Sequence, residues 1–306
     1  SCDYVGPFAV PTLEGATGCH EFLELATGFA AVVLCTSKGD FAVVLRRVLI
    51  RFVYPFIAAM LCLTCDCALE YGWGSSGCHE LKRFCLAAFI KLRYNAPYTP
   101  NHNDTERLHK TLTRIMLRLM IQAGAPEPFW GLARLMALEI YLCMPSERAL
   151  RYKGYVCSPR HAYTSAPEDL SHIHPFMCLC HVLNDSATIT MRHLQRHGTA
   201  ALMVGVGRTE GVEYYSVWCP NENLLRQTRN VRFHDRVFPL MDGSLLWDPS
   251  ANRGTWRFPM YGHLEPLNPG RASSLRLNPH IAPSSGDPFS RVATQRCEYD
   301  WLRPTP

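Results

Sequence analysis

Hydrophobic and polar positions follow two different periods in the first third of the chain. Residues 29–34 form a short apolar run with β-branched members, which predicts a buried strand. Residues 56–65 are again apolar and predict a second buried strand, which ends just before Asp66. Between these runs, five apolar residues recur at helical spacing: Phe41, Val44, Leu45, Val48 and Leu49. The order strand, helix, strand is typical of an α/β layered fold.

The middle of the chain carries the helical period. Residues 104–124 predict one amphipathic helix, for which Asp104 or Thr105 is the expected N-terminal cap. Prolines then separate this helix from a second, more apolar helix over residues 129–144.

Short strand-like runs replace the helical pattern after residue 173, for example at 200–205 and 214–218. They predict a small, separate β module. Beyond residue 242 the chain is rich in Pro, Gly, Ser, Asn and Arg, which is typical of a disordered tail. We therefore divide the chain into four parts: a core over 1–150, a linker over 151–172, a β module over 173–240 and a largely disordered tail over 241–306.

Composition adds three constraints. A chain of 306 residues with 47% hydrophobic residues can bury a sizeable core, and its net charge of +5 permits nucleic-acid binding without requiring it. The 14 cysteines are scattered, which favours free thiols in a reducing, intracellular compartment. The longest charge-free apolar run, 52–65, contains Pro55 and is too short to cross a bilayer, so no membrane partner is expected. Without an initiator Met or a signal peptide, the chain is expected to be a fragment or a processed piece.

Three separated carboxylates are the candidate catalytic and metal-binding residues: Asp3, Asp66 and Glu106. Asp66 ends a buried strand, and Glu106 lies in the first turn of a helix, where the dipole favours its ionised form. Two like charges 4 Å apart cost roughly 4 kcal/mol at an effective dielectric of 20. Divalent cations remove that cost, and three acids of this kind suit a two-metal phosphoryl-transfer site with Mg²⁺ or Mn²⁺. The alternative is that each acid is an ordinary turn or helix-dipole residue.

A basic strip follows Glu106 on the same helix. Arg107, Lys110 and Arg114 are candidate DNA-binding residues, because Lys110 and Arg114 are spaced by four and share the face of Glu106. The alternative is a solvated helix face with a Glu106–Lys110 pair.

A second candidate metal site is a zinc site at Cys62 and Cys65, which have Cys67, Cys78 and His79 downstream. Strand alternation directs Cys62 and Cys65 to opposite faces, and the spacing is unlike that of structural zinc sites. We interpret these cysteines as small buried hydrophobic residues.

Several short motifs occur in order between residue 3 and residue 235. The patterns Asp-x-x-Gly-Pro, Leu-x-x-Asp-x-x-x-Glu-Tyr and Pro-Tyr-Thr-Pro followed by Glu-Arg match at these positions: Asp3, Gly6, Pro7; Leu63, Asp66, Glu70, Tyr71; Pro97, Tyr98, Thr99, Pro100, Glu106 and Arg107. Together these motifs resemble the integrase of copia-type long-terminal-repeat retrotransposons, and the segments 123–130, 169–178 and 230–235 resemble later segments of that family.

The resemblance implies an RNase H-like α/β core, a mixed five-stranded sheet with flanking helices, followed by a small β-barrel-like module. It implies that Asp3, Asp66 and Glu106 hold two Mg²⁺ or Mn²⁺ ions for 3′-end processing and strand transfer. The implied partners are element-end DNA, target DNA and further copies of the chain, with the nucleus as the location of an active protein.

This chain also departs from the family pattern. The family's Arg, Asn and Gly around the second Asp are Thr64, Cys67 and Ala68 here, and the first strand is shorter than expected. Losing Gly restricts the turn that aims Asp66. These departures favour a second hypothesis, a catalytically inactive remnant that binds nucleic acid or partner subunits. A third is a nuclease of the same fold, because fold and site do not fix the acceptor.

Overall fold

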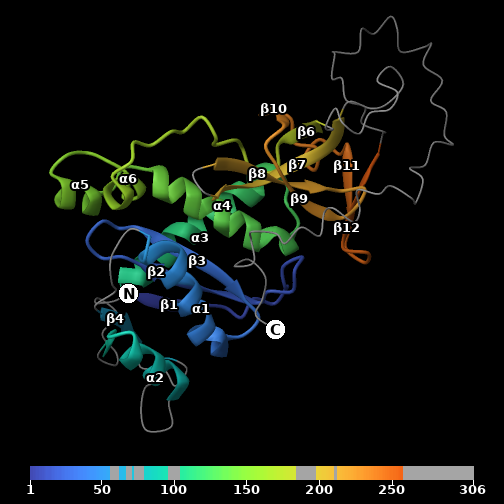
Figure 1. The fold of residues 1–306 in the computed structure, drawn as a ribbon. Coiled ribbons are helices and arrows are strands. Elements are labelled where there is room, and N and C mark those ends of the chain that lie inside the picture. Colours follow the sequence, from blue (N-terminus) through green and yellow to red (C-terminus); the bar gives the residue numbers. More distant parts are fainter. Residues whose placement is uncertain are drawn as a thin grey trace, which may run out of the picture. The chain divides into compact units, whose positions relative to one another are not determined.

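The computed structural model describes residues 1–55, 62–66, 71, 79–95, 104–183, 198–209 and 212–257 (Figure 1). The chain divides into two compact units between Phe176 and Met177. The first unit is mixed α/β, and the second is built on an antiparallel β-sheet. The predicted α/β class is therefore confirmed in its coarse form.

Three antiparallel strands in the order β1-β2-β3 form the first sheet. Their register places Asp3 opposite Glu21, and every residue of β2 and β3 is buried. The buried strand predicted over 29–34 is confirmed as β3. The bounds are β1 (Cys2–Val5), β2 (Gly18–Leu23) and β3 (Ala30–Cys35).

Helices cover both faces of this sheet, as Figure 1 shows. His20 and Phe22 of β2 contact Phe41 of α1 (Phe41–Val48), with ring centroids 5.1 and 5.9 Å apart. Glu21 points the other way and contacts Arg134 of α4 (Trp130–Cys143), because neighbouring strand residues alternate between faces. The helical stripe predicted at 41–49 is confirmed: its five apolar members are all buried.

A parallel pair of strands, β4 (Cys62–Cys65) and β5 (Lys91–Tyr94), lies next to β1. The thiol of Cys2 in β1 donates a hydrogen bond to the sulfur of Cys65 in β4, at 3.2 Å. Helix α2 (His79–Ala87) precedes β5. The last four residues of the strand predicted over 56–65 are observed as β4. Residues 56–61 lie outside the described residues.

Helix α3 (Asp104–Ala123) and α4 confirm the two helices predicted in the middle of the chain. A short 3₁₀ turn, η5 (Glu127–Phe129), leads from one to the other, and α5 (Glu147–Lys153) follows. The segment predicted as a linker contains α6 (Pro159–Thr164). Both short helices begin at a serine whose side chain accepts a backbone N–H, Ser146 for α5 and Ser158 for α6.

The second unit holds a five-stranded antiparallel sheet in the order β10-β6-β7-β8-β9, which confirms strand structure in the predicted β module. The buried Trp218 of β8 packs on Trp247, with ring centroids 5.9 Å apart. Trp247 belongs to a two-stranded sheet that extends structure beyond residue 240, where the sequence predicted a disordered tail. The bounds are β6 (Leu179–Leu183), β7 (Gly198–Thr209), β8 (Val212–Cys219), β9 (Leu224–Thr228), β10 (Val231–His234), β11 (Leu245–Asp248) and β12 (Arg253–Trp256).

Among the described residues, no helix is both long enough and apolar enough to cross a bilayer.

Candidate functional site

Asp3, the first candidate acid, lies in the middle of β1. Its Oδ1 accepts a hydrogen bond from the backbone N–H of Tyr4 at 2.8 Å. Because Asp3 and Glu21 are directly opposite in the register, their side chains share the face of the sheet that α4 covers. Asp3 therefore lies on the side of the sheet that carries the polar contacts described below.

Asp66 follows β4 directly, as the sequence predicted. The contact between Cys2 and Cys65 involves the residues that immediately precede Asp3 and Asp66. Desolvation raises the pKa of Tyr71 far above its ordinary value, and the charges of both Asp3 and Asp66 raise it further. Both carboxylates thus lie within electrostatic range of one hydroxyl group.

Glu106 lies in the first turn of α3, and that end of the helix is held near β1. Thr105 Oγ donates a hydrogen bond to Ser1 Oγ at 2.8 Å. Arg148 forms an ion pair with Asp104 and also donates to a backbone carbonyl 123 residues away in sequence. These contacts fix the start of α3, and with it the backbone of Glu106, beside the strand of Asp3.

The carboxylate of Glu106 pairs with a cation on its own helix. Lys110 Nζ lies 2.8 Å from Glu106 Oε1, and this hydrogen bond and charge lower the pKa of Glu106. The i, i+4 pair that the sequence offered as an alternative is therefore present. Both side chains are solvent-accessible, 62% for Lys110 and 37% for Glu106, so a divalent cation can compete with Lys110 for the carboxylate.

The three acids have suitable donor atoms for a hard cation, but their positions do not form a metal site. Carboxylate oxygens are the ligands that Mg²⁺ and Mn²⁺ prefer. Within the ranges that the structure describes, however, no group of three or more His, Cys, Asp or Glu residues is close enough to hold a metal ion. The elements that carry the three acids are brought together, but the carboxylates are not gathered into a cage. Their assignment as metal ligands stays a prediction.

The candidate DNA-binding residues Arg107, Lys110 and Arg114 are all exposed on α3. They present three cationic groups over about two turns of one helix, next to the carboxylate of Glu106. Such a strip is accessible to phosphate groups, which are the usual protein-binding sites on nucleic-acid backbones.

A buried ion pair that the sequence analysis did not single out lies under this strip. Arg134 and Glu21 are both fully buried, and Arg134 Nε donates to Glu21 Oε1 at 2.8 Å. Arg134 also contacts two residues of α3: it donates to Thr113 Oγ at 2.7 Å, and its Nη2 lies 2.7 Å from His109 Nδ1. One guanidinium group thus connects α4, α3 and β2.

Opposing effects act on the Glu21 carboxyl group. Burial raises the pKa of Glu21, Arg134 lowers it, and the charge of Asp3 across the strand pair raises it again. A sequence signal for the pair exists: Arg134 is the only charged residue between Trp130 and Leu138 of an apolar helix. A cation in such a position requires a buried anionic partner.

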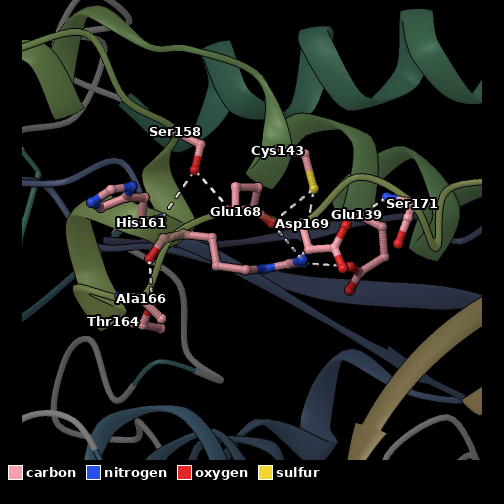
Figure 2. Close-up of polar contacts among 10 residues, drawn as sticks. Glu139, Cys143, Ser158, His161, Thr164, Ala166, Glu168, Asp169 and Ser171 are labelled. Atoms are coloured by element: carbon pink, nitrogen blue, oxygen red, sulfur yellow. Dashed lines mark hydrogen bonds and ion pairs between the residues drawn. The ribbon is translucent and has the colours of Figure 1, made fainter. Parts of the chain in front are cut away.

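A second polar cluster joins α4 to α6, and Figure 2 shows its members converging. Arg160 forms ion pairs with Glu139 and Glu168, and Ser158 Oγ donates to Glu168 Oε2 at 2.9 Å. The Cys143 thiol donates to Glu168 Oε1 at 3.3 Å. Burial, with the neighbouring carboxylates, raises the pKa of Cys143 to about 12. The thiol is therefore protonated near neutral pH and is not an activated nucleophile, so we interpret the cluster as a clamp between helices.

Comparison with protein-family models and with curated protein sequences finds no match for this chain.

Proposed function

We propose that the chain is an integrase-like polynucleotidyl transferase with an RNase H-like core, in which Asp3, Asp66 and Glu106 hold two Mg²⁺ or Mn²⁺ ions. The observation that carries the proposal is a pair of contacts, Cys2 with Cys65 and Ser1 with Thr105. Each of the three acids follows immediately after a residue of these contacts. Three carboxylates that are remote in sequence thereby come from three neighbouring elements.

The arrangement of the strands supports the same proposal. The sheet β1-β2-β3 is antiparallel, the pair β4-β5 is parallel, and β4 lies next to β1. Placed edge to edge, the two pieces give the order β3-β2-β1-β4-β5. That order corresponds to the mixed five-stranded sheet that the family resemblance implies.

The residues of the chain itself divide the work of the proposed reaction. When bound, two divalent ions supply an activated water or 3′-hydroxyl and stabilise the leaving oxygen. Arg107, Lys110 and Arg114 bind backbone phosphates and so position the DNA. Lys110 has a second role in this proposal. It pairs with the Glu106 carboxylate, and it would have to release that carboxylate for Glu106 to bind a metal ion.

A second candidate function is DNA binding without catalysis. The ion pair between Glu106 and Lys110, and the lack of a gathered acid cluster in the described ranges, favour it. In that case the basic strip of α3 is retained while the metal site is lost. Assembly into oligomers and a nuclear location belong to the first proposal. Processing of DNA ends without joining would indicate the nuclease instead.

Calorimetric titration with Mn²⁺ distinguishes the two candidates. We expect Asp66→Asn and Glu106→Gln each to weaken Mn²⁺ binding at least tenfold, because each removes one anionic ligand. Glu147→Gln is the matched control, since Glu147 also lies in the first turn of a helix and pairs with an Arg four residues on. Equal binding by all four proteins, or none by the wild type, would overturn the metal site.

Strand transfer in Mn²⁺ is the activity readout. A short duplex with a recessed 3′ end serves as donor and a supercoiled plasmid as target. Joined products from the wild type and from Glu147→Gln, but not from Glu106→Gln, are expected. If all three proteins bind DNA and none of them forms joined products, the result supports the non-catalytic alternative.

A further inference from the structure

His109 lies where the basic strip of α3 meets the buried ion pair. The preceding residue, Leu108, is buried, and the following residue, Lys110, is exposed. The His109 side chain is one-third exposed, at 33%. One edge of its ring contacts Arg134 through Nδ1, at 2.7 Å. The side chain therefore spans the boundary between the interior and the strip proposed to bind DNA.

Arg134 determines which ring nitrogen of His109 carries the hydrogen. A guanidinium group only donates hydrogen bonds and stays charged in proteins. His109 Nδ1 must therefore accept, and the hydrogen of the neutral ring resides on Nε2. Arg134 cannot swing away without losing its other bonds, to Glu21 and to Thr113. The tautomer of His109 is thus fixed by a buried network.

The same surroundings keep the ring neutral. Burial, and then the charge of Arg134, lower the pKa of His109 below its ordinary value. Lys110 lowers it further and Glu106 opposes them. Glu21 Oε2 lies 4.0 Å from Nδ1, but its charge is already shared with Arg134. A proton on Nδ1 would point at a permanent cation, which is why protonation is disfavoured.

We propose that His109 is a DNA-positioning residue, whose Nε2–H donates a hydrogen bond to a backbone phosphate oxygen without contributing charge. This inference rests on the proposed function and assigns a further residue to the same site. His109 lies one turn after Glu106 and between Arg107 and Lys110, both of which are exposed. No hydrogen bond to Nε2 is formed by any residue in the described part of the chain.

A neutral donor and a cation leave different signatures in salt titrations. Each cation that neutralises a phosphate releases counterions, so its loss reduces the slope of log K against log salt by about one. A hydrogen bond from a neutral group adds affinity and leaves that slope unchanged. The proposal is therefore separable from a nonspecific electrostatic role of the same helix.

The experiment measures binding of a fluorescent DNA duplex by anisotropy at several salt concentrations between about 50 and 200 mM. His109→Phe keeps an aromatic ring but removes the donor, and we expect its affinity to fall about tenfold with an unchanged salt slope. Lys110→Gln should reduce the slope by about one. Thr113→Val is the matched control: it also removes one contact of Arg134 on α3, but no DNA donor, and should bind within twofold of the wild type.

Two further measurements support the test, and the first does not depend on how well any variant folds. In the wild type, ¹⁵N NMR of the histidine ring near pH 7 should show the neutral Nε2–H tautomer for His109. Replacing single phosphates by uncharged methylphosphonates should reveal one position at which His109→Phe has no additional effect.

The outcomes separate this inference from the proposed function. A wild type that binds no DNA overturns both. A wild type that binds DNA while His109→Phe binds equally well, or a doubly protonated His109 near pH 7, overturns the role of His109 alone. An equal loss in His109→Phe and Thr113→Val also overturns it, because the effect then comes from Arg134.

Discussion

Cys2 and Cys65 hold their sulfur atoms 3.2 Å apart although 63 positions separate them in the sequence. Both residues are buried, and each immediately precedes a candidate metal-binding acid. The contact connects the edge strand of the antiparallel sheet to the parallel pair β4-β5. The whole proposed site depends on this junction, since it determines how near Asp3 and Asp66 lie.

Oxidation with diamide should therefore link Cys2 to Cys65. Two thiols form one disulfide while diamide is reduced to its hydrazine, and the sulfurs need to approach by only about 1 Å. The reaction should be slow, because burial raises the pKa of Cys2 and thiolate is scarce. Peptide mapping after alkylation of the remaining thiols identifies the link, and Cys65→Ser removes it. A link from Cys65 to a different cysteine would contradict the junction.

The buried pair of Glu21 and Arg134 predicts an unusually large stability effect. Glu21→Gln leaves a guanidinium group in the core without its counter-charge, so we expect the free energy of unfolding to fall by about 3 kcal/mol in urea denaturation. Glu147→Gln breaks an exposed pair with Arg151 and should cost under about 1 kcal/mol. Similar losses in both variants would show that the interior pair is not held as described.

The double variant Glu21→Met with Arg134→Met tests why the pair is costly to break. Replacing both charges by apolar groups removes the desolvation penalty together with the attraction, so most of the stability lost in Glu21→Gln should return. A double variant that is less stable than Glu21→Gln would instead assign the loss to packing.

The sequence predicted the elements that depend on local periodicity. The stripe from Phe41 to Leu49 and the two helices over 104–124 and 129–144 were found because side-chain spacing within one helix is a local property. Helix α6 was missed, since six residues give too little periodicity, and its contacts with Glu139 and Glu168 come from elsewhere in the chain.

The polar network could not be predicted in the same way. Glu21 and Arg134 are 113 positions apart, and no local pattern relates them. The sequence does indicate that Arg134 needs a partner, but not which carboxylate supplies it. Likewise, the sequence offers two roles for Glu106, as a metal ligand or as the ion-pair partner of Lys110, and local spacing does not decide between them. The structure shows the ion pair.

Acidification should reduce stability through His109, in addition to any other titrating group. Its pKa in the folded protein is below the ordinary value of 6.5. As the pH falls below about 6.5, the unfolded chain binds a proton that the folded chain does not, so unfolding becomes more favourable. The loss continues until the pH passes the folded pKa. Stability from His109 is thus fully present above 6.5 and declines on the acid side.

The measurement compares urea denaturation of the wild type and His109→Gln at pH 7.5 and at pH 5.5. The free energy of unfolding of the wild type, relative to that of His109→Gln, should be lower at pH 5.5 than at pH 7.5, because only the wild type takes up a proton at His109 on unfolding. A difference that is constant with pH would mean that His109 titrates alike in both states.

In the second unit, the close approach of Gly254 to Trp218 gives a prediction that does not involve the acids. A Cβ atom at Gly254 would lie 2.5 Å from the Trp218 ring. The ring cannot easily move, because it is fully buried and its Nε1 donates to Asn223 at 3.2 Å. Gly254→Ala should therefore destabilise this unit by about 1–3 kcal/mol.

Circular dichroism during urea denaturation measures these losses, because it does not require a tryptophan at position 218. The smaller ring of Trp218→Phe makes room for the new methyl group, so the double variant should lose less stability than the sum of the two single losses. Additive losses would mean that the methyl group does not meet the ring, and that β12 does not pack on β8 as closely as described.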